Sequence, residues 1–157
     1  MKDVSEIIYL PYLLTLQAAE NQIASIDFLT AARDSLHYLQ QLTLSKNKLT
    51  ALPALPLPRL TVLNLNENEI ATAAAFEGHA NLLNLNLAQN KLLNCAGISN
   101  LPKLKVLDLS QNEIGELTHG LHGLTSLEKL VLAKNKLVTL DGFPHFPALT
   151  HLVLSEN

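Results

Sequence analysis

The pattern Leu-x-x-Leu-x-Leu-x-x-Asn recurs along the 157 residues and constrains the fold more than any other feature. Five copies are complete, an earlier copy has Ala18 in place of a leucine, and a last copy ends with the chain. The asparagines follow one another at steps of 26, 21, 22, 22, 23 and 22 residues. Self-similarity at such a period is typical of a solenoid, in which each repeat stacks on its neighbours. The seven asparagines are Asn21, Asn47, Asn68, Asn90, Asn112, Asn135 and Asn157.

The leucines of each copy predict a strand, because Leu-x-Leu alternates with period two and buries one face. Stacked copies should pair these strands in parallel along the concave side. After each asparagine, apolar residues recur about every third position, which favours short 3-10 turns and irregular arms on the convex side. Only the longer first arm has room for a short helix, over residues 30–36. The chain is therefore predicted to be an α/β solenoid with seven parallel strands, at residues 15–17, 41–43, 62–64, 84–86, 106–108, 129–131 and 151–153.

The seven asparagines are predicted to form a structural ladder. Each should turn the chain away from its strand, and an amide side chain both donates and accepts hydrogen bonds. It can therefore satisfy backbone groups that the turn would leave buried and unpaired. One unpaired buried group costs roughly 1–3 kcal/mol, so replacing a ladder asparagine should be costly.

The length is that of a single domain, residues 1–157. The chain begins and stops inside the repeat pattern, and neither end has a recognisable polar cap. Uncapped repeats expose core and an unpaired strand edge. We therefore expect either a fragment of a longer solenoid or ends that are covered by partners.

Charge and cysteine content restrict the partners and the compartment. Eleven Lys and Arg residues against 14 Asp and Glu residues give a net charge of -3, which argues against a nucleic-acid partner. The single cysteine, Cys95, cannot form an intrachain disulfide, and no signal peptide is recognisable, so a cytoplasmic location is expected. No apolar run approaches the roughly 20 residues of a membrane span, so no membrane association is expected.

Residue types that often carry chemistry do not assemble into a site in this sequence. His119 and His122 are three residues apart, but a zinc site needs further ligands and none is near in sequence. Asp141 and His145 flank a turn without a matching nucleophile. Cys95 falls in an apolar column, which favours a buried structural thiol. No phosphate-binding glycine loop is present. We therefore expect no enzyme, no cofactor, no metal and no small-molecule substrate.

The concave face is the candidate binding surface, because strand residues between the core leucines point there. It is small and nearly uncharged, with amides in its N-terminal half and valines in its C-terminal half. An amide strip suits hydrogen bonding to a protein segment, although the same residues also suit a strand without any partner. Exposed valines on successive strands need a partner or further repeats around them. The candidates are Gln41, Thr43, Asn64, Asn86, Asp108, Lys129, Val131, His151 and Val153.

The repeat length and the Asn-x-Leu/Ile-x-x-Leu/Ile arms resemble the intracellular class of short leucine-rich repeats. Within that class, residues 97–112 and 135–143 are most similar to the radial-spoke leucine-rich-repeat proteins of motile cilia. The resemblance implies a non-enzymatic subunit of the axoneme that is held by other protein subunits of a larger assembly. Two departures are Ala18 and the absence of the acidic helical tail that this family leads one to expect. A phosphatase-regulator-like subunit and a ribonucleoprotein scaffold remain the alternatives.

Overall fold

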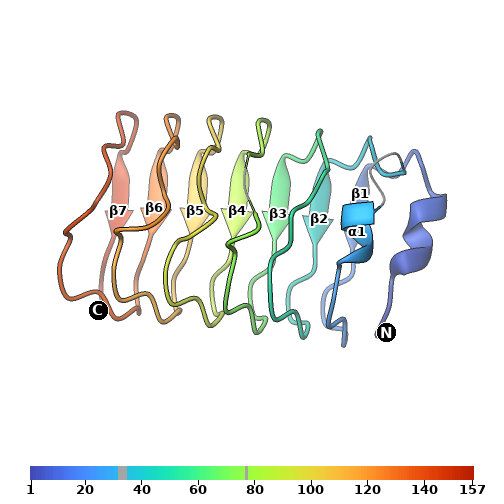
Figure 1. Cartoon of the computed structure of the whole chain (residues 1–157), viewed down its shortest axis with the longest axis horizontal. Helices are drawn as coiled ribbons and strands as arrows, with labels where there is room; N and C mark the ends of the chain where they lie inside the picture. The colour runs from blue at the N-terminus through green and yellow to red at the C-terminus, as the bar shows by residue number, and fades with distance from the viewer. Residues whose placement is uncertain (32–34, 77) are drawn as a thin grey trace.

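The computed structural model describes residues 1–31, 35–76 and 78–157. Seven strands form one sheet in chain order, and every neighbouring pair is parallel, so the chain is a solenoid (Figure 1). The strand ranges are those that the repeat pattern predicts. They are β1 (Thr15–Gln17), β2 (Gln41–Thr43), β3 (Val62–Asn64), β4 (Asn84–Asn86), β5 (Val106–Asp108), β6 (Lys129–Val131) and β7 (His151–Val153).

Little helix accompanies the strands in the described part of the chain. A 3-10 helix, η1 (Ser5–Tyr9), precedes the sheet, and one α-helical turn, α1 (Phe28–Ala31), lies in the first arm. The helix therefore begins two residues before the predicted range 30–36, of which residues 32–34 lie outside the described residues. The later arms run as turns and irregular backbone, as the spacing of three predicts. Within the described ranges, no helix has the length and apolar character that crossing a bilayer requires.

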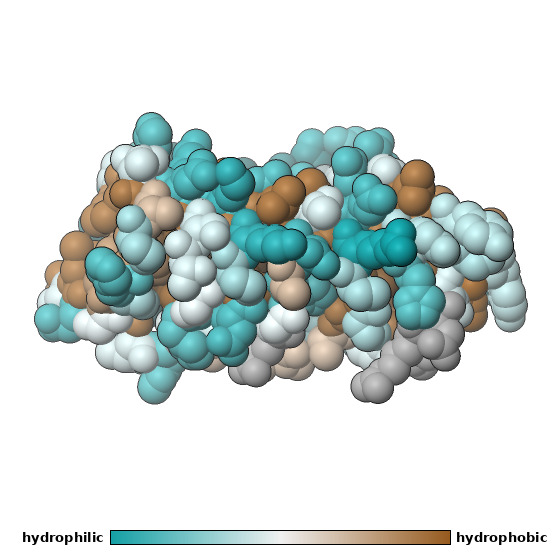
Figure 2. Space-filling model, turned by 90° about the horizontal axis from the view of Figure 1, so that it is seen from above, coloured by the Kyte–Doolittle hydropathy of each residue, from teal (hydrophilic) through white to brown (hydrophobic). Residues whose placement is uncertain are grey.

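The two edges of the sheet differ in the turns that they carry. At one edge, which lies uppermost in Figure 1, a tight turn leads from each arm into the next strand. Seen from above, this edge presents hydrophilic residues across its middle and apolar residues toward β7 (Figure 2). At the other edge, each strand leads into the turn that holds an asparagine of the ladder. The residue before each of these asparagines has φ between 54° and 58°, as in Gln89 and Lys134.

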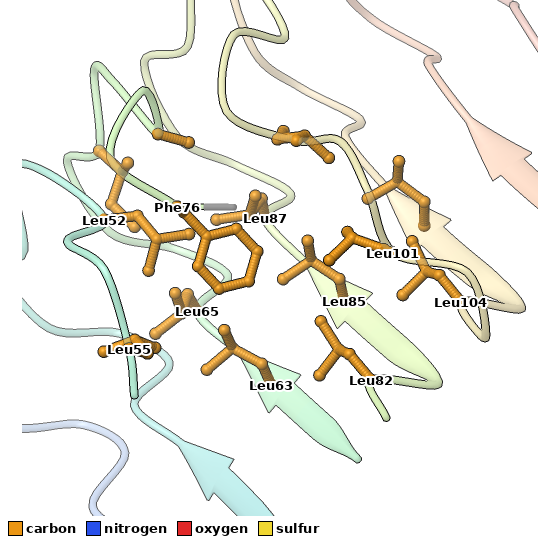
Figure 3. Packing of buried hydrophobic residues seen from close by; sticks show 14 of the residues in the cluster. Leu52, Leu55, Leu63, Leu65, Phe76, Leu82, Leu85, Leu87, Leu101 and Leu104 are labelled. Atoms are coloured by element: carbon orange, nitrogen blue, oxygen red, sulfur yellow. The ribbon is translucent and has the colours of Figure 1, made fainter. Parts of the chain in front are cut away.

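The core is a continuous stack of aliphatic side chains between the strands and the arms. The central leucines of β2 to β6 are directly in register and at most 1% exposed. Leu152 of β7, the strand at the edge of the sheet, is 39% exposed. Phe76 is the largest fully buried side chain and lies among leucines of β3 and β4 (Figure 3). Removal of this apolar surface from water, roughly 25 cal/mol per Å², is the main source of stability.

The middle asparagines link consecutive turns through a repeated set of hydrogen bonds. Asn90 is buried, and its Oδ1 accepts from the Ile70 backbone N–H of the preceding repeat at 2.9 Å. Its Nδ2 donates to the carbonyl oxygens of Leu65 in the preceding repeat and Leu87 in its own, each at 3.0 Å. Each asparagine therefore satisfies backbone groups of two repeats. The corresponding bonds are made by Asn47, Asn68, Asn112 and Asn135.

The first and last asparagines make similar hydrogen bonds but are less buried. Asn21 is half-buried, and its Oδ1 accepts from the amino terminus of Met1 at 2.8 Å. Asn157 is exposed, and it accepts from the Leu137 N–H at 3.3 Å. The ladder is therefore best protected from water in the middle of the solenoid.

Candidate interaction surface

Strand register builds the concave face into columns that cross all seven strands. Paired residues place Asn64 beside Asn86, Asn86 beside Asp108, and Asp108 beside Val131. The preceding column brings Lys129 beside His151 in the same way. Because strands lie about 4.8 Å apart, neighbouring members of a column are close enough to contact one partner segment. The structure thus brings the sequence-derived candidates onto one face, with Gln41 and Thr43 at its N-terminal side and Val153 at its C-terminal side.

Part of the amide strip has a structural task. The Oδ1 of Asn64 accepts from the backbone N–H of Asn66 at 3.2 Å, and that of Asn86 accepts from Ala88 at 3.0 Å. Asp108 does the same with Ser110 at 2.9 Å. Each of these side chains therefore supports the turn after its own strand. The Nδ2 groups of Asn64 and Asn86 make no hydrogen bond with the described residues, so they remain as donors toward a partner.

The C-terminal half of the face is apolar at its centre. Val131 is half-buried on β6, and its neighbour in register, Val153, is 37% exposed on β7. Lys129 and His151 border them, and both are exposed. The Nδ1 atom of His151 lies 2.8 Å from the hydroxyl oxygen of Thr150. Together these residues form an apolar strip with polar margins, which is the usual anatomy of a protein interface.

The residues weighed for chemistry lie mainly on the convex arms. His119 and His122 are exposed on a convex arm, and within the described part of the chain no group of three His, Cys, Asp or Glu side chains is arranged to hold a metal ion. Asp141 accepts a hydrogen bond from the Thr139 hydroxyl at 2.9 Å. Burial raises the pKa of the Cys95 thiol to about 12, so the reactive thiolate is not populated near neutral pH.

His79 is a buried group that the sequence reasoning missed. Its ring stacks on Phe76, with centroids 4.6 Å apart and planes 18° from parallel. The residue is 7% exposed, and desolvation lowers the pKa of the imidazole to about 4. His79 follows Phe76 by three residues, so the spacing of the arm could have placed it in the core column. We interpret it as a neutral core residue rather than a ligand.

The edge that carries the turns before the strands was also missed. Five residues, each four positions before the central leucine of β1 to β5, form what we term the lateral row. The Tyr12 and Tyr38 rings lie 5.8 Å apart, and the Arg59 guanidinium lies 4.6 Å above the Tyr38 ring. Counting back from each strand would have aligned these positions in the sequence. The lateral row is Tyr12, Tyr38, Arg59, Asn81 and Lys103.

Family comparison assigns the repeats directly. A model described as leucine rich repeat matches residues 96–137, and a model of two leucine rich repeats matches residues 39–78. The two matches together cover about half of the chain. No curated protein matches the sequence significantly.

Solved structures with the same fold come from larger chains. The chain is similar to one in the crystal structure of the TLR13–ssRNA13 complex, with 32% identity and a TM-score of 0.84 over 98% of its own length. It spans 23% of that chain. An internalin (inlF) from Listeria monocytogenes is 24% identical, with a TM-score of 0.62 over 96% of this chain and 50% of the internalin. The internalin supports the fold alone.

Proposed function

Since this chain is a leucine-rich-repeat protein, we propose that it is a non-enzymatic interaction module whose concave face binds a segment of another protein. The supporting observation is the register that sets Val131 beside Val153 in an otherwise polar column. Burying apolar area contributes roughly 25 cal/mol per Å², whereas a hydrogen bond exchanged with water nets only about 0.5–1.5 kcal/mol. The valines therefore supply affinity, and the free donors of Asn64 and Asn86 fix the position of the bound segment.

We favour a protein over a nucleic acid as the partner of this face. TLR13 was crystallised in complex with ssRNA13, but this chain spans only 23% of the TLR13 chain. Phosphate recognition requires clustered cations. Here the net charge is -3, and the only charged residue in the central column of the concave face is Asp108.

Within this class we propose a structural subunit of the ciliary axoneme, held in a radial spoke. The support is the resemblance of residues 97–112 and 135–143 to the radial-spoke leucine-rich-repeat proteins. A phosphatase-regulator-like subunit and a ribonucleoprotein scaffold are the alternatives in the cytoplasm. Expression of the tagged chain in a ciliated cell tests the location: retention in detergent-extracted axonemes is expected. A tagged chain that stays in the detergent-soluble fraction contradicts the axonemal role while leaving the interaction module open.

Val131→Asp tests the concave face directly. The change would place an unpaired charge in the proposed interface, and incorporation into axonemes should fall about tenfold or more. Val138→Asp is the matched control, because Val138 is 90% exposed on the arm after β6. Aspartate at position 131 also lies beside Asp108, so Val131→Thr is needed as a variant without like-charge repulsion. Incorporation of folded Val131→Asp equal to that of the parent chain would refute the assignment of the concave face.

A further inference from the structure

The lateral row is a line of contacts that crosses five repeats. Tyr38 lies between the Tyr12 ring and the Arg59 guanidinium. Farther along, the Nζ of Lys103 donates to the Oδ1 of Asn81 at 2.8 Å. Asn81 in turn donates to the carbonyl oxygen of Pro58, next to Arg59, at 2.9 Å. Each exposed side chain of the row is therefore positioned by its neighbour.

Among the described residues, the cations of the row have no carboxylate partner, unlike those of the opposite edge. On the opposite edge Lys46 pairs with Glu20 at 2.9 Å, and Lys136 pairs with Glu113 at 2.7 Å. Arg59 and Lys103 form no ion pair with any described carboxylate. The Tyr38 ring occupies one face of the Arg59 guanidinium, and no described residue accepts a hydrogen bond from its in-plane N–H donors. Lys103 uses one of three donors on Asn81. The chain is acidic overall, but this edge presents positive charge.

Arg59 and Lys103 both line a hollow of about 340 Å³. Thr61 and Leu83 contribute to its lining, and none of its described lining residues is a carboxylate. Figure 2 looks onto this edge, where hydrophilic side chains stand in a row across the middle. Two cations that line one hollow suit an acidic side chain, because Arg and Lys form their strongest hydrogen bonds with carboxylates.

We propose that the lateral row binds an extended acidic segment of a partner protein, with one carboxylate in the hollow between Arg59 and Lys103. The apolar end of the same segment packs against Tyr12, which is 79% exposed, and Tyr38. The inference rests on the proposed function in taking the partner to be a protein, but it does not depend on the concave face. A single-stranded nucleic acid fits less well, since the row offers two unpaired cations and a phosphate backbone requires many.

The binding test uses the full chain and fluorescence anisotropy with three labelled probes. The first is a peptide of alternating glutamate and phenylalanine, the second has glutamine in place of glutamate, and the third is an oligouridylate. The variant Arg59→Gln/Lys103→Gln is compared with Lys46→Gln/Lys136→Gln, which removes two charges from the opposite edge. We expect the first variant to weaken binding of the glutamate peptide about tenfold or more and the control less than about twofold. The glutamine peptide should bind more weakly than the glutamate peptide.

Further measurements distinguish binding at the lateral row from binding at the concave face. Val131→Asp should keep its affinity for the glutamate peptide, so loss of concave-face binding alone leaves the lateral row intact. Thermal melts establish that the variants are folded, and Lys103→Glu replaces the double variant if that one is unfolded. The inference is overturned if the parent chain does not bind the glutamate peptide, if both double variants lose affinity equally, or if the oligouridylate binds more tightly than the peptide.

Discussion

Replacement of His79 by leucine should remove a pH-dependent component of stability. The ring is packed on Phe76, and burial lowers the pKa of the imidazole from 6.5 to about 4. As the pH falls below about 6.5, the unfolded chain takes up a proton that the folded chain does not bind until the pH is near 4. The unfolded state therefore binds more protons in this window, so the free energy of unfolding falls as the pH falls. The stability that the neutral His79 contributes is fully present above the pKa of the unfolded chain, 6.5.

The magnitude follows from the two pKa values. At a pH low enough to protonate His79 in both states, the free energy of unfolding has fallen by about 3 kcal/mol. Each unit of difference between the folded and unfolded pKa values is worth about 1.36 kcal/mol. At pH 4.5 most of this loss, about 2–3 kcal/mol, should have occurred. His79→Leu abolishes the proton uptake and places in this column the residue type found at Leu57, Leu101 and Leu124, which are buried.

The assay is urea unfolding of both proteins between pH 7.5 and pH 4.5. Between pH 7.5 and pH 4.5, the free energy of unfolding of the parent chain should fall by about 2–3 kcal/mol more than that of the variant. Lysine partners lower the pKa values of carboxylates such as Glu69 and Glu113, so protonation of these carboxylates in acid also lowers the free energy of unfolding. They affect both proteins equally, so the difference between the two isolates His79. His119→Leu, at an exposed convex position, is the control. A difference that stays constant from pH 7.5 to pH 4.5 would refute the argument.

Two further predictions concern the solenoid itself. Asn90→Leu should lower the free energy of unfolding by about 3 kcal/mol because it leaves buried donors and acceptors unpaired. Asn21→Leu should lower it by about 1 kcal/mol, because Asn21 is half-buried. Equal midpoints of the two variants in urea would contradict the ladder account. Gly97→Ala should cost about 3 kcal/mol or more, because φ is 86° and a Cβ would lie 1.8 Å from the Ala73 carbonyl oxygen. Gly78→Ala is its control, with φ of 73° and no atom within 4 Å of the added Cβ. If calorimetry shows that both variants lose the same stability, the close approach at Gly97 is not the cause.

The strand positions were predictable because several copies of one pattern align one another. A single Leu-x-Leu is common, but copies in register fix which leucines are buried and where each strand lies. The concave candidates followed at once, since period two leaves only one direction for the residues between core leucines. The same reasoning predicted Val131 and Val153 on one face, and the two residues are paired in register in the sheet.

Other features depend on backbone geometry that the repeat does not encode. His79 has the spacing of a core position in its arm, but a histidine there is also compatible with solvent exposure, so its burial against Phe76 becomes clear only in three dimensions. The residues of the lateral row lie in turns, where period two no longer fixes side-chain direction. Lys134 and Gln89 adopt positive φ without being glycine, which composition alone does not predict. The helix began at Phe28 rather than Thr30 because helix ends are the least determined part of a pattern.

The ladder has a consequence for how such a chain can change in length. Each middle asparagine bonds only to its own turn and to the one before it, so removal of one complete coil would leave every remaining partner in place. Small insertions are absorbed by the arms, where the steps between asparagines already range from 21 to 26 residues. A one-residue shift within a strand would instead turn its leucine toward water. Each strand thus presents two of its three residues on the concave face, whereas the length of that face is set by the number of coils.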